Sequence, residues 1–414
     1  MIANFSHFFK SFRGAAIFGA GRAPIAGGRV WIFLPLIIAF SITGCAGFGR
    51  SISATGTGEA VEMGIGDIVD TKRQGLITFD ELISALSEIP VVYVGETHTS
   101  IEDHNSQLAI LRKLYQKNQC VMVGMEMFPR SAQPVLDSYV RGDITEEQFL
   151  TEVRWNEVWG FPYELYRGLI DFARENKLRI IALNAPIKIV STIARNGLGS
   201  LSPDDRARIA RDFHLDDPAN RLRMQKEFSA HGKGGIKDFD SFFEAQLAWE
   251  ETMAETIVEQ LQAGLGNCRM LVIIGRGHIS QRLGVPYLAN LRVAHEYRTV
   301  SQVPIDYPYG TFDPNLADYV MITDKSEPPH RPRLGVKIQT AASGKGVEIM
   351  EVLPDSPAAK ADIRTGDIVL RVDEAPVKTA EELQRAVARG GPTLKIEIER
   401  GKKRLSINVQ TARE

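Results

Sequence analysis

The hydrophobic pattern of residues 66–320 predicts strands that alternate with helices. Helical periodicity runs through residues 103–117, 131–141, 145–154, 162–176, 203–213 and 240–263. Between these segments lie short apolar runs typical of buried parallel strands, namely Val91–Val94, Val121–Met125, Arg179–Leu183 and Leu271–Ile274. The alternation indicates an α/β fold with a mostly parallel sheet. Residues 129–260 hold more helix than the crossovers need, so we expect part of them to form a helical lid over the sheet edge.

A second, smaller domain is predicted at residues 334–412, after a polar, proline-rich linker at 321–333. One helix is expected at Thr379–Ala388, with Thr379 as N-cap and Glu382 three residues later. The remaining pattern is that of short strands at Leu334–Gln339, Val347–Val352, Asp367–Asp373, Leu394–Glu399 and Leu405–Val409. The domain is therefore expected to be β-rich.

Residues 1–44 have the pattern of a lipoprotein signal peptide. A basic stretch precedes the uncharged run from Val30 to Gly44, which is short and is broken by Pro35, so it is poorly suited to span a membrane. The run ends in Ile-Thr-Gly-Cys45, which resembles a bacterial lipobox and implies an acylated Cys45. A plain signal peptide or a short anchor is the alternative.

The residue after the cysteine bears on which membrane would hold the lipid. Ala46, rather than Asp, stands at that position, and by resemblance this favours the outer membrane, facing the periplasm, over the inner one. Residues 45–65 would then form a tether between the lipid and the first domain.

The charge and cysteine content limit which partners and which covalent links we expect. Four of the 49 basic residues lie in residues 1–44, so the rest of the chain carries 45 basic against 51 acidic residues. Because no basic stripe with interleaved aromatics is present, a nucleic-acid partner is not expected. Cys120 and Cys268 each precede a strand-like run, and we expect two separate buried side chains, with a disulfide as the alternative.

Polar residues follow each predicted strand of the first domain. In an open parallel sheet the ligand crevice lies outside the carboxyl ends of the strands, so these residues should converge on one pocket. The predicted pocket residues are Glu96, His98, Glu126, Asn184, Arg276 and His278, with His104 on the helix after the first of them. The alternatives are satisfied structural polar groups and, for Arg276, simple neutralisation of Glu96 or Glu126.

The residue types of this predicted pocket are compatible with more than one chemistry. Two imidazoles and two carboxylates could bind a divalent transition metal, for which Glu96, His98 and His278 are the candidate ligands. They could also polarise a water molecule or hydrogen-bond the propionates of haem.

A family resemblance favours haem. The segments that carry it are Gly95–His104, Gly124–Phe128, Ala182–Pro186, Glu244–Ala254 and Gly275–Pro286, which together resemble the ChaN-like haem-binding lipoproteins of the TIKI and erythromycin-esterase superfamily. The resemblance spans residues 66–310. It implies a sheet-plus-lid fold, haem binding, a part in iron uptake and a homodimer able to cover two haems.

Haem ligation in this family is associated with tyrosine, a hard anionic ligand that suits ferric iron. Tyr163 and Tyr166, beside the aromatic residues Trp155, Trp159 and Phe161, are the candidate iron ligands. The alternative is that both tyrosines belong to the core of the lid.

The C-terminal domain resembles the PDZ domains of Deg/HtrA proteases. Residues 353–369 carry the resemblance, with Asp362 where the family usually has glycine. It implies strand addition of a partner's C-terminal peptide, with Leu334, Gly335 and Val336 near the terminal carboxylate and Leu383, Ala386 and Val387 on the facing helix. The alternative is a domain that docks on the first domain or dimerises.

Three functions follow from these observations. The leading expectation is a membrane-anchored haem-binding protein, rather than an enzyme, whose PDZ domain recruits a peptide partner. The second is a hydrolase that uses the paired Gly-x-x-His motifs with a metal or an activated water. The third is an envelope adaptor that acts through the PDZ domain alone.

Overall fold

The computed structural model describes residues 53–54, 63–231, 236, 238–266, 268–306, 311–325, 333–341, 344–401 and 403–411. The chain divides into two compact units, residues 1–326 and residues 327–414. Cys45 and the predicted signal peptide lie outside the described residues. None of the helices in the described ranges combines the length and the apolar character that crossing a bilayer requires.

The first unit is built on an eight-stranded sheet of order β3-β2-β10-β8-β4-β7-β5-β6. From β10 to β6 all neighbours are parallel, whereas β2 pairs antiparallel with β10 and β3. The strands are β2 (Ile68–Asp70), β3 (Gly75–Ile77), β4 (Val91–Glu96), β5 (Val121–Pro129), β6 (Ile180–Asn184), β7 (Arg269–Gly275), β8 (Tyr297–Pro304) and β10 (Tyr319–Thr323). This confirms the α/β class and the mostly parallel sheet. A separate parallel pair joins β1 (Ser53–Ala54) to β9 (Thr311–Phe312).

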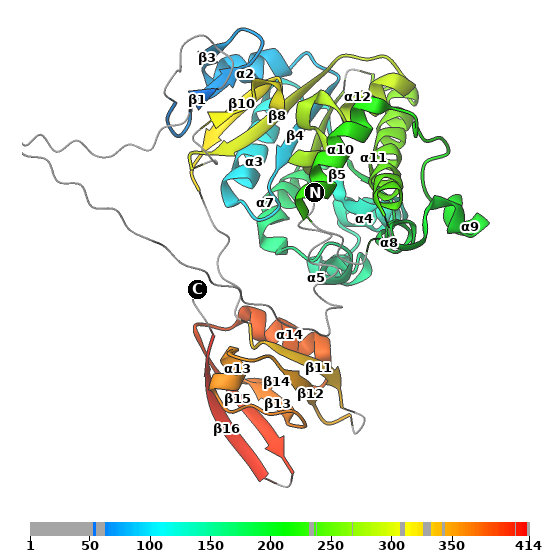
Figure 1. The fold of residues 1–414 in the computed structure, drawn as a ribbon. Helices are drawn as coiled ribbons and strands as arrows, with labels where there is room; N and C mark the ends of the chain where they lie inside the picture. Colours follow the sequence, from blue (N-terminus) through cyan, green and yellow to red (C-terminus); the bar gives the residue numbers. More distant parts are fainter. Residues whose placement is uncertain are drawn as a thin grey trace, which may run out of the picture. The chain divides into compact units, whose positions relative to one another are not determined.

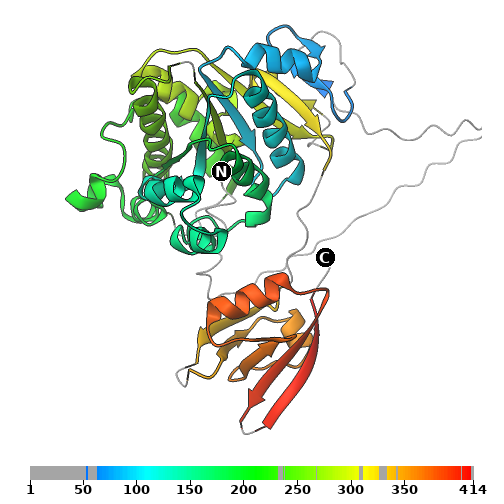
Figure 2. The ribbon, with the colours of Figure 1, turned by 180° about the vertical axis from the view of Figure 1, so that it is seen from behind.

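Alternating strand residues face two different hydrophobic cores. One core packs α2 (Phe79–Leu86), α3 (Ile101–Lys117), α4 (Gln133–Arg141), α5 (Glu146–Glu152), α6 (Trp155–Val158) and α7 (Tyr163–Glu175) against one face of the sheet (Figure 1). The other packs α8 (Ile187–Asn196), α11 (Phe239–Gln262) and α12 (Val285–Arg292) against the opposite face (Figure 2). Because both faces are covered, strands β4, β5, β6 and β7 are mostly apolar.

Two parts of the predicted pattern were wrong. The helix expected at 203–213 ends after one turn, as α9 (Pro203–Arg206), because the Arg206 guanidinium donates to the carbonyls of Ala210 and Arg211 and holds the chain in a turn. The central strand β8 was not predicted, although it pairs with both β4 and β10. Its polar residues Thr299, Ser301 and Gln302 are buried and break the apolar run that marked the other strands.

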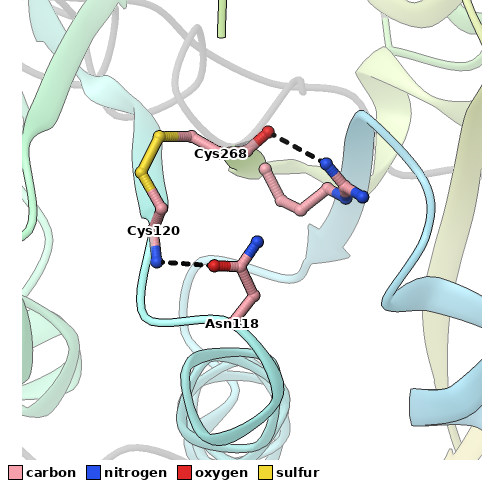
Figure 3. The surroundings of a disulfide bond; sticks show 4 residues. Asn118, Cys120 and Cys268 are labelled. Carbon is pink, nitrogen blue, oxygen red and sulfur yellow. Dashed lines mark hydrogen bonds between the residues drawn. A yellow bond between two sulfur atoms is a disulfide. The ribbon is translucent and has the colours of Figure 1, made fainter. Parts of the chain in front are cut away.

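The two cysteines form a disulfide, so the expectation of two separate buried side chains was wrong (Figure 3). Strands β5 and β7 are neighbours with Val121 opposite Arg269, which places Cys120 beside Cys268 at the amino ends of both strands. Their Cα atoms are 4.4 Å apart across 148 residues of chain. Cys120 is exposed and Cys268 half-buried, so the bond lies at the protein surface.

The second unit is an antiparallel sheet of order β11-β12-β13-β15-β16, with β14 paired to β13. Its strands are β11 (Val336–Thr340), β12 (Val347–Val352), β13 (Ile368–Val372), β14 (Ala375–Pro376), β15 (Thr393–Arg400) and β16 (Lys403–Gln410). Helix α13 spans Pro357–Lys360, and α14 spans Ala380–Arg389. The predicted capping box is present, since Thr379 accepts from the Glu382 amide and the Glu382 side chain accepts from the Thr379 amide.

Candidate functional site

Glu96, the last residue of β4, is a buried carboxylate surrounded by four donors. Its Oε1 accepts from His98 Nδ1 at 2.8 Å and from the Tyr166 hydroxyl at 2.7 Å. Its Oε2 accepts from Gln107 Nε2 at 3.0 Å and lies 3.3 Å from His104 Nδ1. Helix α3 supplies His104 and Gln107 from one face, because residues three apart on a helix are neighbours. Glu96 therefore ties β4, α3 and α7 together.

The backbone of Gly275, the last residue of β7, lies between the side chain of His98 and that of the second buried carboxylate, Glu126. A Cβ placed on Gly275 would lie 2.8 Å from His98 Cε1 and 3.3 Å from Glu126 Oε2, so only glycine lets both side chains approach this backbone. The Gly275 amide donates to Glu126 Oε2 at 2.5 Å. The motif glycine is thus explained by close approach rather than by a turn.

The second histidine motif extends the cluster to the opposite core. His278 Nε2 lies 3.3 Å from Glu126 Oε1, and His278 Nδ1 lies 3.0 Å from Glu250 Oε1 on α11. Arg223, on α10 (Pro218–His231), donates to both Glu250 oxygens at 2.9 and 2.7 Å. We call the connected set the strand-end cluster, and its members are Glu96, His98, His104, Gln107, Glu126, Tyr166, Arg223, Glu250 and His278.

The charges of the strand-end cluster stabilise one another although they are buried. Burial by itself would lower the pKa of His278, but Glu126 and Glu250 raise it to about 9. Burial would raise the pKa of Glu126, but His278 and His98 lower it to about 2. The pKa values of Glu96 and Glu250 are also lowered, the former by its histidines and the latter by Arg223 and His278, against the effect of burial. At neutral pH His278 is therefore an imidazolium between two carboxylates.

This arrangement predicts a definite pH dependence of stability. The contribution of His278 is complete below its ordinary pKa of 6.5 and is lost as the pH rises through about 9. The contribution of Glu126 is complete above its ordinary pKa of 4.5 and is lost as the pH falls through about 2. Thermal melts of the wild type should show the melting temperature of the first unit falling from pH 6.5 to pH 9, and His278→Gln should flatten that alkaline decline. An equally steep decline in His278→Gln would contradict the assignment.

Aromatic side chains cover the histidine of the first motif. The His98 ring lies 4.8 Å from the Trp159 ring and 4.9 Å from the Phe161 ring, measured between centroids. Tyr166 is fully buried, and its ring makes an edge-on contact with the His104 ring at 4.4 Å between centroids. Tyr163 is also buried, but its ring packs on Trp155, and burial raises its pKa strongly. Of the two predicted iron ligands, Tyr166 has its hydroxyl in the cluster, whereas the Tyr163 ring packs among the aromatic side chains of the core.

The remaining predicted pocket residues stand at the edge of the strand-end cluster. Asn184, at the end of β6, donates to the Glu126 backbone carbonyl at 2.9 Å and so braces β5. Arg276 donates to the Gln302 carbonyl at 2.7 Å. It also lies near Asp103, whose pKa is raised by burial and lowered in part by Arg276. Arg276 thus acts on Asp103 and β8, whereas the basic side chains that contact Glu126 and Glu96 are histidines.

The alternative of a metal held by Glu96, His98 and His278 is not supported by this geometry. Within the described ranges, no group of three or more His, Cys, Asp or Glu side chains is arranged to hold a metal ion. The physical reason is that His278 directs both ring nitrogens at carboxylates and is protonated on both at neutral pH. Protonated nitrogens cannot serve as metal ligands.

Sequence reasoning missed Arg223, Glu250 and Gln107. Glu250 lies on α11, where every residue from Ala245 to Val258 is buried, and an acid flanked by apolar residues such as Ala248 and Trp249 is a signal that could have identified it. Gln107 lies one turn after His104 on the same face of α3, which is a weaker signal. Nothing in the α10 sequence distinguishes Arg223 from the arginines around it.

In the second unit, the predicted peptide-binding residues lie at the start of the edge strand β11 and on helix α14. Leu334, Leu383 and Val387 are buried in the unit's core, while Val336 and Ala386 pack against it half-buried. Gly335 has φ +71°, and a Cβ there would lie 2.4 Å from Ser356 Cβ, so this position requires glycine. Because β11 is a sheet edge, its outer side can accept another strand.

Comparison with known proteins identifies both units. The family model for haem-binding uptake proteins of the Tiki superfamily, ChaN, matches residues 82–288, half of the chain. The chain belongs to the ChaN family. A PDZ-domain model matches residues 332–411, so the second unit is a PDZ domain following the ChaN-like domain.

Individual relatives resemble one or the other domain. A structure of ChaN from Campylobacter jejuni, described as showing cofacial haem binding, is 20% identical and covers 62% of this chain and 95% of that one, with a TM-score of 0.50. RETICULATA-RELATED 5, a chloroplastic protein of Arabidopsis thaliana, is 23% identical over 219 residues, 47% of this chain. Serine protease HTRA1 of Xenopus tropicalis is 28% identical over 92 residues, 18% of this chain. The chain spans 28% and 20% of the lengths of these two curated relatives.

Proposed function

We propose that this protein is a lipid-anchored haem-binding protein of the bacterial envelope that serves iron uptake and recruits a peptide partner through its PDZ domain. Membership of the ChaN family carries the haem part of the proposal. The strand-end cluster supports it, because it joins a buried imidazolium, a phenol and an aromatic cover at the carboxyl edge of a parallel sheet.

The residues present suit haem in three respects. The rings of Trp159, Phe161 and His98 offer surfaces on which a flat macrocycle can stack. The side-chain amides of Gln246 and Gln302 are fully buried, and among the described residues neither has a hydrogen-bond partner for its nitrogen or its oxygen, so both can pair with a ligand such as a propionate. The Tyr166 hydroxyl can supply an oxygen ligand to ferric iron once it has lost its proton.

Glu96 is positioned to take that proton. The Tyr166 hydroxyl donates to Glu96 Oε1 at 2.7 Å, and burial together with Glu96 raises the pKa of Tyr166 well above its ordinary value. The phenol therefore stays neutral in the structure described here. A ferric ion near the oxygen would stabilise the phenolate, and Glu96 Oε1 is the acceptor within reach.

Haemin titration of the mature protein tests this proposal. The wild type should give a saturable Soret shift, together with the charge-transfer absorption of a phenolate-bound ferric haem. Tyr166→Phe should abolish that absorption and weaken binding at least about tenfold, since one ligand bond is lost. His98→Ala combined with His278→Ala should also weaken binding. Tyr163→Phe is the matched control one turn away, and its spectrum should equal that of the wild type.

A wild type without saturable binding would refute the haem proposal. Unchanged absorption in Tyr166→Phe would refute Tyr166 as the iron ligand while leaving haem binding in place. Thermal melts of each variant separate loss of binding from loss of folding.

A hydrolase is the second candidate, and the pairing of Glu96 with His98 favours it. A carboxylate at Nδ1 orients a histidine so that Nε2 can act as a general base. His278, protonated and held by two carboxylates, is unsuited to that task. Elemental analysis of the purified protein bears on this candidate: stoichiometric Mn, Co or Zn that is lost in His98→Ala would favour catalysis over haem binding.

The envelope location is proposed from two observations. The Ile-Thr-Gly-Cys45 pattern supports a lipid anchor, and the Cys120–Cys268 disulfide suits an oxidising compartment such as the periplasm. Palmitate labelling in a bacterial host, lost in Cys45→Ala, would support the anchor. A labelled Cys45→Ala variant would refute it.

For the PDZ domain we propose binding of a C-terminal peptide with an apolar last residue. The apolar side chains of Leu334, Leu383 and Val387 lie where that residue would insert. Leu383→Asp should weaken binding of a peptide library ending in Val, Leu or Ile at least about tenfold, measured by fluorescence anisotropy. An amidated peptide that bound as tightly as the free acid would contradict carboxylate recognition.

A further inference from the structure

The strand-end cluster is closed in the structure, so a ligand can reach it only if a covering element moves. Glu96, His98, Glu126 and His278 are each at most 4% exposed. Besides α3, which supplies His104 and Gln107, three helices contact the cluster, namely α7 through Tyr166, α11 through Glu250 and α10 through Arg223. The helix that opens most readily is the one whose displacement from the cluster costs the least free energy.

Helices α7 and α11 are held by extensive apolar packing. Seventeen residues of α11 are buried, and α7 buries Tyr163, Tyr166, Leu169, Ile170 and Ala173. Moving either helix would expose much of a hydrophobic core. Neither is suited to open on its own.

Helix α10 is attached differently. Of the side chains described on this helix, Asn220, Arg223 and Met224 are the buried ones, and two of the three are polar. Leu222, by contrast, is 58% exposed. An element with few buried apolar contacts opens locally more readily than the core around it.

The amino-terminal half of α10 is pinned to the loop that carries His278. Arg223 donates to the Gly277 carbonyl at 2.9 Å as well as to Glu250, and Asn220 Oδ1 accepts from the Gly284 amide at 3.2 Å. Gly284 has φ +71°, and a Cβ there would lie 2.3 Å from the His278 carbonyl oxygen. Helix α10 therefore holds both ends of the loop from Gly277 to Gly284 by polar contacts.

The carboxyl-terminal half of α10 is held by aromatic contacts. Phe228 lies 5.2 Å from Phe242 and 5.7 Å from Phe239, measured between ring centroids. These contacts join α10 to the first turn of α11. Arg221 also pairs with Asp240 and lies over the Phe239 and Phe243 rings. The first turn of α11 is therefore the fixed point of α10, and Arg223 with Asn220 forms a separate polar latch on the loop.

We propose that α10 is a gate over His278, latched by Arg223 and Asn220 and pivoting about Phe228. When the latch opens, the Arg223 guanidinium leaves Glu250 and the second histidine motif becomes accessible from the side of α10. Arg223 is in this view a positioning residue, because it holds His278 through Glu250 and the Gly277 carbonyl. The inference rests on the proposed function only for the identity of the ligand that the gate admits.

Hydrogen exchange of the ligand-free full-length protein tests the gate. Amides of residues 220–228 should exchange at least about tenfold faster than those of residues 245–257 on α11. Arg223→Met, which keeps the apolar stem but removes the guanidinium, should accelerate the α10 amides a further tenfold or so and leave the α7 amides unchanged. Asn220→Ala provides a second way to weaken the latch without unpairing Glu250, and it should act in the same direction.

Lys226→Met is the matched control, since it removes an exposed positive charge from the same helix. Its exchange should equal that of the wild type. Wild-type α10 amides as slow as those of α11, or equal exchange in Arg223→Met and Lys226→Met, would overturn the gate. Faster association of haemin with Arg223→Met than with the wild type is the expected functional result.

The exchange measurements need no ligand, so the two proposals can fail separately. A wild type that binds no haemin but shows the predicted exchange would refute haem binding and retain the gate. Saturable haemin binding with a slowly exchanging α10 would do the reverse.

Discussion

Glu250→Leu is expected to lower the free energy of unfolding of the ChaN-like domain by about 3–5 kcal/mol. Glu250 is fully buried and pairs with Arg223 Nη2 at 2.7 Å and with His278 Nδ1 at 3.0 Å. Without it, the buried Arg223 guanidinium loses its carboxylate partner and His278 keeps only Glu126. Breaking a buried ion pair on one side is costly because the remaining charge stays out of water.

Urea unfolding followed by tryptophan fluorescence measures this effect. Glu250→Gln should cost less, since glutamine keeps the shape and an acceptor oxygen. Glu259→Gln is the matched control on the same helix. The Glu259 side chain is 46% exposed, and its substitution removes an ion pair with Arg211 whose nitrogen and oxygen lie 4.0 Å apart. Its effect should stay within about 0.5 kcal/mol. Similar losses in Glu250→Leu and Glu259→Gln would contradict the role of Glu250.

The Glu250 variants should also change the pH profile. Glu250 contributes to the raised pKa of His278, so its removal should bring that pKa down from about 9 toward its ordinary value. The alkaline loss of stability should still begin near pH 6.5 in Glu250→Gln, but it should end at lower pH and be smaller than in the wild type.

Removal of the disulfide is the second change with a large expected effect. The double variant Cys120→Ala, Cys268→Ala should lose about 2–4 kcal/mol of unfolding free energy, because the bond closes a loop of 148 residues and restricts the unfolded chain. The bond joins β5 and β7 at their amino ends, and the same strands carry Glu126 and the His278 motif toward the cluster at their carboxyl ends. Loss of the bond should therefore lower stability more than haemin affinity.

Guanidinium unfolding with and without a thiol reductant provides the control. The reduced wild type should unfold at the same denaturant concentration as the double variant, and the reductant should not affect the double variant. A wild-type midpoint that is insensitive to reductant would show that the bond does not contribute to stability.

The sequence predicted much of the fold because local signals agreed with the tertiary outcome. The four apolar runs became β4, β5, β6 and β7, since strands buried on both faces are apolar throughout. The Thr379 capping box formed as expected, because it depends on residues three apart. Strand β8 was missed, since its buried polar residues are satisfied or enclosed only within the assembled sheet.

The sequence by itself determined the family motifs, the α/β class and the placement of Glu96, His98, Glu126 and His278 at strand ends, because these follow from patterns that are local along the chain. Only the tertiary structure decided that Cys120 meets Cys268, that Arg223 and Glu250 complete the charge set, and that Tyr166 rather than Tyr163 reaches Glu96. These contacts join residues between 27 and 148 positions apart. Such distances are set by the order of the strands and the packing of the helices, which no local pattern encodes.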